Sequence, residues 1–134
     1  MDYIDRIVRG IRILDRRFAP QAYDFVLDSL EHTTRLAERD GRSAKDVSTT
    51  ECFVISMGLA VDNFGPMAAL VLRRWGISQV SDIRDIMVSL ERAGLLFDVD
   101  ADALDSFPME IEQIVQSLAE QRYQRVSDEL GTRN

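Results

Sequence analysis

The stretch Phe64–Ile77 constrains the fold of this chain more than any other, because it carries both a helix start and a helix stop. Pro66 suits the first position of a helix, where its missing N–H leaves no hydrogen bond unmade. Gly76 suits the position just past the last turn, where a residue in the left-handed conformation closes a helix. The sequence therefore predicts a helix over about residues 66–75.

This helix is apolar around most of its circumference, with Arg73 and Arg74 as its one charged edge. A helix without a broad polar face is normally buried on more than one side. We therefore expect Met67 and Trp75 to pack in the core rather than to bind a ligand.

A capping box predicts the start of the preceding helix. The Ser48 hydroxyl can accept from the Glu51 N–H, while the Glu51 carboxylate reaches back to the Ser48 N–H. The segment 52–61 is apolar nearly all round, and the capping box favours a helix over a buried strand. Polar and turn-forming residues interrupt this region after about ten residues, which is too short to cross a bilayer. Because two such helices exceed what a small domain can cover, we expect a partner or a second copy to bury part of their surface.

Residues 2–17 are predicted to form an amphipathic helix, because apolar residues recur there at helical spacing. Four arginines fall on the face opposite the apolar stripe: Arg6, Arg9, Arg12 and Arg16. One interpretation is a solvated helix face, in which Asp2 pairs with Arg6 and Asp5 pairs with Arg9. The other is a surface that contacts an acidic partner, and it makes these four arginines the candidate partner-binding residues.

Three further helices are predicted from caps and periodicity: Pro20 to about Glu38, Asp82 to about Ala93 with its cap at Ser81-Asp82, and Pro108 to about Gly131. We therefore expect a mainly α fold, a compact bundle of about five to six helices. A short strand or hairpin after residue 94 is the winged-helix-like alternative. Residues 1–108 would form the helical core domain, and residues 109–134 a C-terminal helix that docks on it with a frayed end.

No residue pattern indicates catalysis, a cofactor or a metal. The single histidine, His32, lacks a second ligand nearby and is expected at the surface or at a cap. Cys52 has no CxxC partner and no histidine placed to activate it, so it is expected to be a small buried apolar residue. The spacing of Asp98–Asp102 resembles the opening of a calcium-binding loop, but Ala103 and Met109 replace the glycine and glutamate that such a loop needs. The chain is therefore expected not to be an enzyme.

The net charge of −7 repels phosphate backbones and anionic lipid surfaces on average. Nucleic acid is therefore an unfavourable partner, and no membrane association is expected. The first residues contain no long apolar run behind a basic start, so a secretory signal is not expected. A single cysteine excludes an internal disulfide framework and is compatible with a reducing compartment. These features together predict a cytoplasmic protein.

Four segments form one pattern along the chain: Tyr23–Leu30, Phe64–Ala68, Val71–Ile77 and Ala93–Leu96. Together they resemble a family of small bacterial proteins that has no established activity. In that family an F-G-P-M sequence leads to W-G-I and then to A-G-L-L. The resemblance spans roughly residues 4–108 and implies a compact cytoplasmic domain, without assigning any catalytic or binding residue. The helix after Pro108 departs from the family pattern, which makes it a candidate for a specialised role.

These observations predict a non-enzymatic protein–protein interaction or adaptor module that binds another protein or a second copy of itself. The alternative is a winged-helix DNA-binding or transcription-associated protein, in which the helix 82–93 would read the groove. That helix carries a net charge of −1, whereas a groove-reading face should be basic. The sequence therefore favours the interaction module.

Overall fold

The computed structural model describes residues 2–95 and 98–131. Within them the chain forms six α-helices and two short 3₁₀ helices, with no strand. The α-helices are α1 (Tyr3–Leu14), α2 (Pro20–Arg39), α3 (Thr49–Phe64), α4 (Ala68–Arg74), α5 (Val80–Arg92) and α6 (Ile111–Gly131). The 3₁₀ helices are η1 (Ala44–Asp46) and η2 (Gly65–Met67). The predicted mainly α bundle is confirmed.

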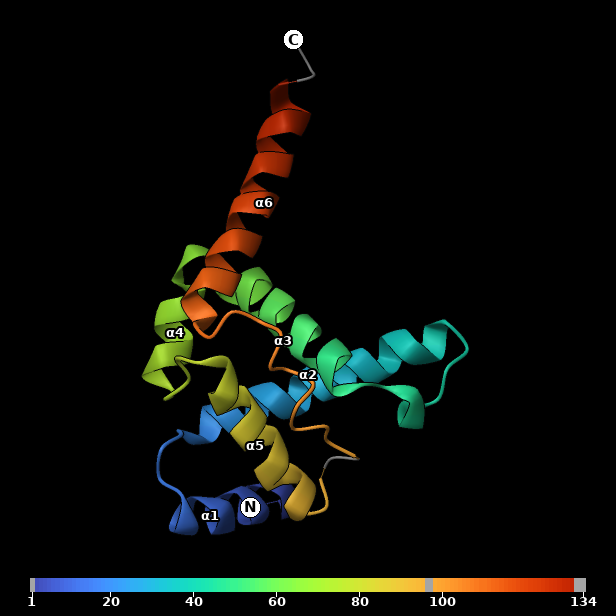
Figure 1. Ribbon diagram of the computed structural model, residues 1–134, viewed down its shortest axis with the longest axis vertical. Helices are drawn as coiled ribbons and strands as arrows, with labels where there is room; N and C mark the ends of the chain where they lie inside the picture. The colour runs from blue at the N-terminus through green and yellow to red at the C-terminus, as the bar shows by residue number, and fades with distance from the viewer. Residues whose placement is uncertain (1, 96–97, 132–134) are drawn as a thin grey trace.

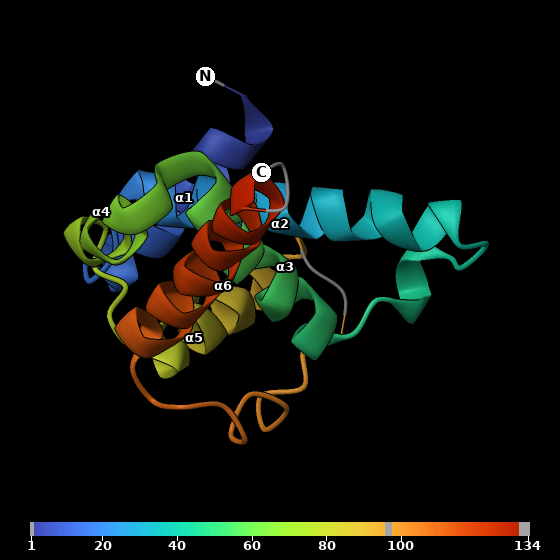
Figure 2. The ribbon, with the colours of Figure 1, turned by 90° about the horizontal axis from the view of Figure 1, so that it is seen from above.

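The longest shared packing surface lies between α2 and α3, which cross at the centre of the molecule (Figure 1). Helix α5 packs on α2, the first turns of α6 pack on α3 and α4, and α1 lies across one end. The C-terminal end of α2 and η1 extend to one side of this body (Figure 2). One continuous core joins these elements, and its largest fully buried side chains include Phe18, Tyr23, Phe53, Met57, Leu72, Ile83, Ile86 and Leu90.

Two helix starts depend on short capping contacts. At α3, the Glu51 N–H donates to Ser48 Oγ over 3.0 Å and the Ser48 N–H donates to the Glu51 carboxylate, so the predicted capping box is confirmed. The cap predicted for α5 is right in using Asp82 and wrong in placing the N-cap at Ser81, since the N-cap is Gln79. This helix begins at Val80, and Asp82 accepts from the N–H groups of Ser78 and Gln79, each over 2.9 Å. Asp82 is therefore the third residue of the helix and reaches back to its start.

The chain changes direction sharply between α3 and α4 (Figure 1). Gly65 occupies this turn with φ 54°, and Pro66 follows it in η2. The glycine therefore separates α3 from α4 at a positive φ.

The run Thr49–Arg74 spans 26 residues and contains an 18-residue window with a mean hydropathy of 1.5, so by length and composition it matches a membrane-crossing helix. The expectation that this region is too short is therefore wrong. The match is weak evidence for a span, because core helices of soluble proteins meet the same criteria.

Helix α4 is less buried than the sequence predicts. It is only seven residues long and turns one face, with Ala68 and Leu72, into the core. Trp75 follows it and is half-buried, with its ring centroid 5.9 Å from that of Phe25. Met67 lies on the outer side and is 54% exposed. The prediction of core packing therefore fails for Met67, because no described element covers that side of the helix.

Both terminal helices are shorter than predicted at one end. Helix α1 ends at Leu14 rather than Arg17. Helix α6 starts three residues after Pro108, because Glu110 forms an isolated bridge with Gln79 and so remains extended. The strand proposed after residue 94 is not seen in the described part of that segment, and its residues 96 and 97 lie outside the described residues. The described residues therefore give no support to a wing.

Candidate protein-interaction surface

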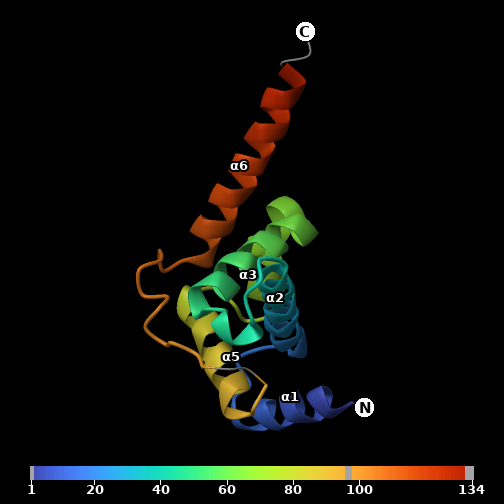
Figure 3. The same cartoon turned by 90° about the vertical axis from the view of Figure 1, so that its right-hand side faces the viewer.

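Helix α1 is the element that carries the arginines singled out by the sequence. Its N-cap is Asp2, whose carboxylate accepts from the Asp5 N–H over 2.8 Å. Val8 is its one buried side chain, and Ile11 is partly buried against the core. Because so little of α1 is covered, most of its circumference is open to solvent at one end of the molecule (Figure 3).

Large apolar side chains on α1 remain exposed. Leu14 is 91% exposed and Ile13 is 69% exposed, and Tyr3 and Ile4 are also exposed at the other end of the helix. Scattered apolar residues are normal on a protein surface, but several on one short helix are typical of a contact site.

The structure groups three of the four candidate arginines. Arg9, Arg12 and Arg16 line one shallow hollow of about 310 Å³ together with Ile13. Arg6 lies outside that hollow, less than one helical turn before Arg9. A second hollow of about 290 Å³ lies on the other side of Arg9 and Arg12 and reaches Asp24 on α2. We call Arg6, Arg9, Arg12 and Arg16 the arginine stripe.

Most of the arginine stripe forms no ion pair within the part of the chain that the structure describes. The ion pairs predicted between Asp2 and Arg6 and between Asp5 and Arg9 do not form. Arg12 is partly buried, and its Nε donates to the Phe18 carbonyl over 3.0 Å. Among residues 2–95 and 98–131, neither Arg6 nor Arg9 nor Arg16 has an ion pair, so their guanidinium groups are available to another molecule.

Arg17, which the sequence did not single out, has a different role. It pairs with Asp15 over 2.8 Å and with Asp85 on α5 over 3.1 Å, and it lies over the Phe18 ring. The hydrogen bond from Arg17 lowers the pKa of Asp15, and hydrogen bonds to both carboxylates raise the pKa of Arg17. Arg17 therefore attaches the end of α1 to the body and is not part of the open stripe.

Acidic groups border the stripe on the side of α2. Burial raises the pKa of Asp24, and the charges of Asp5, Asp28 and Asp2 raise it further. This local negative charge makes that edge unsuitable for a second carboxylate. An acidic partner would therefore approach from the side of Arg16 and Ile13.

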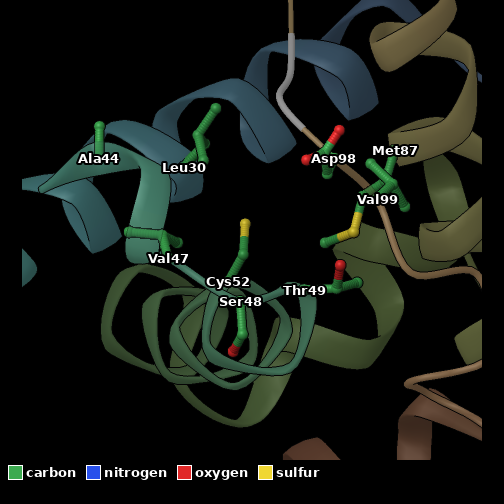
Figure 4. Close-up of a pocket in the computed structure, with 9 residues that line it drawn as sticks. All are labelled: Leu30, Ala44, Val47, Ser48, Thr49, Cys52, Met87, Asp98 and Val99. Carbon is green, nitrogen blue, oxygen red and sulfur yellow. The ribbon is translucent and has the colours of Figure 1, made fainter.

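The other candidate residues lie away from α1. Cys52 is buried, and its thiol points into a small cavity of about 30 Å³ between α2, α3 and α5 (Figure 4). Burial raises the pKa of Cys52 to about 11, so the thiol stays protonated and is a poor nucleophile. The prediction of a small buried apolar residue is confirmed. His32 is exposed on α2, as expected for a surface histidine.

Two further segments of the chain carry candidate sites: the acidic run after residue 97 and helix α5. Within the described residues, no group of three or more potential metal ligands converges, at the acidic run Asp98–Asp102 or elsewhere. On α5, the proposed groove-reading helix, Arg84 pairs with Asp85 over 3.5 Å and lies 3.8 Å from Asp105. These carboxylates neutralise the basic group that a DNA backbone would need.

Comparison with known proteins adds no assignment. A scan against protein-family models finds no match. Searches of the curated proteins and of the solved structures likewise find no similar chain. The resemblance to the small bacterial family therefore remains a prediction, and any function has to be argued from the surface of the molecule itself.

Proposed function

We propose that this chain is a non-enzymatic protein-interaction module that works in the cytoplasm and binds an acidic protein surface through α1. One observation carries the proposal. Arg9 and Arg16 have no ion pair among the described residues, and they line one hollow with the exposed side chain of Ile13. Arginine beside apolar contact area is the composition of interface hot spots.

The two kinds of side chain would contribute differently to binding. The arginines attract an acidic surface and orient it during encounter, an effect that weakens as salt is added. The exposed Ile13 and Leu14 would lose contact with water in the complex, which stabilises it independently of salt. Arg12 would contribute least, because its guanidinium already donates to the Phe18 carbonyl.

The test is capture of partners from the native lysate by tagged protein, with and without nuclease. The double variant Arg9→Glu/Arg16→Glu should lose the captured acidic protein, with an affinity at least about tenfold lower, because two attractive charges become repulsive. Unchanged capture by this variant would exclude the arginine stripe as the contact site.

The matched control is Arg39→Glu/Arg92→Glu. Both arginines are exposed and have no ion pair among the described residues, and they lie on α2 and α5. This control changes the net charge by the same amount and should retain the partner. Loss of the partner in both double variants would mean that net charge, and not the stripe, controls binding.

The same experiment addresses the winged-helix alternative. If capture depended on nucleic acid and disappeared with nuclease, DNA or RNA would be the partner. The ion pairs of Arg84 and the negative charge of α5 argue against that outcome. No described feature favours it over the acidic protein.

A further inference from the structure

The outer part of α6 carries an apolar face that no described element covers. The helix extends well beyond the other helices (Figure 1 and Figure 3). On it, Tyr123, Val126 and Leu130 are 76%, 54% and 61% exposed. Together with the partly buried Ala119 they recur at intervals of four, three and four residues, which keeps them along one line of the helix. We call these four residues the α6 seam.

The base of the α6 seam opens into a groove. A hollow of about 620 Å³ lies between α6 and the turn that joins α3 to α4. Gly65, Pro66 and Ala69 line one side, and Ala119 and Tyr123 are among the residues that line the other. Several of these residues are small, so the groove has room for a large aliphatic side chain.

A fixed contact sets how α6 is rotated. The Arg122 guanidinium donates to the Gly58 carbonyl over 3.1 Å and pairs with Asp62, both on α3. This contact holds Arg122 against α3 and leaves the neighbouring Tyr123 on the side of the groove. The α6 seam is therefore presented in a defined direction at the place where the helix leaves the body.

We propose that two copies of this chain pair through their α6 seams as antiparallel helices related by a two-fold axis. The seam is self-complementary in that arrangement. Tyr123 packs on Val126 of the second copy, and Leu130 packs on Ala119 of the second copy. Each contact occurs twice, as a two-fold interface requires.

The sizes of the seam residues favour antiparallel over parallel pairing. In the antiparallel pair each layer combines a large side chain with a smaller one, and Leu130 of the second copy enters the groove beside Ala69. A parallel pair would instead stack Tyr123 on itself and Ala119 on itself, which gives layers of unequal width. The groove would then remain empty, because both helix tips would point away from it.

Charge favours the same orientation. Each chain carries a net charge of −7. Parallel pairing would hold two acidic bodies side by side, whereas antiparallel pairing places them at opposite ends of the helix pair. The helix dipoles also oppose each other in the antiparallel arrangement, which is favourable.

Sedimentation of the full chain tests the pairing. The wild type should sediment as a dimer when its concentration is raised to about 1 mM. Val126→Glu should weaken dimerisation at least thirtyfold (about 2 kcal/mol), because it buries an unpaired charge twice per dimer. Gln121→Glu is the matched control, because it adds the same charge on the opposite, exposed face of α6. This control should remain dimeric, and circular dichroism should show all three chains folded. A monomeric wild type, or a folded Val126→Glu chain that still dimerises, would overturn the proposal.

Disulfide trapping tests the orientation. In a Cys52→Ala background, chains carrying Ala119→Cys and chains carrying Leu130→Cys are oxidised separately and as a mixture. Antiparallel pairing predicts a crosslink only in the mixture, because the two copies of either position lie about 16 Å apart along the helix axis. A crosslink with Leu130→Cys alone would indicate parallel helices and contradict the proposed pair. The α6 seam shares no residue with α1, so this result is independent of the proposed function.

Discussion

At the scale of single residues, Gly76 occupies the most demanding position that the structure describes. Its φ is +96°, and a Cβ added there would lie 2.2 Å from the Arg17 carbonyl oxygen and 3.2 Å from its carbonyl carbon. The Ala19 N–H donates to the Trp75 carbonyl over 3.0 Å, which holds the link between α1 and α2 against this turn. Gly76 is therefore required both by the helix stop and by the close approach of another backbone segment.

Replacement of Gly76 by alanine should lower the free energy of unfolding by at least about 2 kcal/mol, because strain at positive φ adds to a backbone clash. Gly10→Ala is the control. Gly10 lies inside α1 with nothing within 4 Å of an added Cβ, so the same change should stabilise the protein by up to about 1 kcal/mol. Urea unfolding should therefore show a lower free energy of unfolding than wild type for Gly76→Ala and a higher one for Gly10→Ala. Equal stability of Gly76→Ala and wild type would refute the close approach.

At the scale of elements, the start of α5 can be tested by replacing each of two neighbouring polar residues with alanine. Asp82 accepts two backbone N–H groups at the helix start. The Ser81 hydroxyl donates its one hydrogen bond within the described residues to the Gln79 side chain, over 3.4 Å. Asp82→Ala should therefore cost about 1 kcal/mol of stability, and Ser81→Ala should be nearly neutral. Thermal unfolding measures both. A larger loss of stability for Ser81→Ala than for Asp82→Ala would instead support Ser81 as the N-cap, as the sequence alone predicted.

Helix boundaries could be predicted where the signal is local. The capping box of Ser48 and Glu51 needs only four consecutive residues, and it was identified correctly. The start of α6 could not be identified in this way. Glu110 stays extended because it pairs with Gln79, which lies far away in the sequence. A local pattern that begins at Pro108 contains no information about that partner.

The candidate contact surfaces were predictable only in part. Helical periodicity placed the arginines on one side of α1. The absence of an ion pair to Arg9 among the described residues depends on side-chain positions that spacing does not determine. The burial expected for Met67 failed because coverage of a helix is a tertiary property. The spacing of Tyr123, Val126 and Leu130 can be read from the sequence. Because the residues between them are polar, the apolar line along α6 was not recognised from the sequence alone.

At the scale of the whole molecule, the two proposed contact sites lie at opposite ends. Helix α1 lies across one end of the bundle, and the tip of α6 extends from the other (Figure 3). Distant sites without shared contacts normally contribute additively, within about 0.5 kcal/mol. A dimer of this kind would also present two copies of the arginine stripe, and so could bind two partner molecules.

We therefore expect the seam and stripe variants to act independently. Val126→Glu should leave the affinity of a single stripe for its acidic partner unchanged, while it reduces retention on a surface densely coated with that partner. Arg9→Glu/Arg16→Glu should abolish capture and leave the sedimentation of the dimer unchanged. Titration in solution, surface binding and sedimentation of each variant measure these effects separately. If Val126→Glu lowered the solution affinity as well, part of the partner site would have to be formed by the second copy, because the fold and the stripe of the single chain are intact.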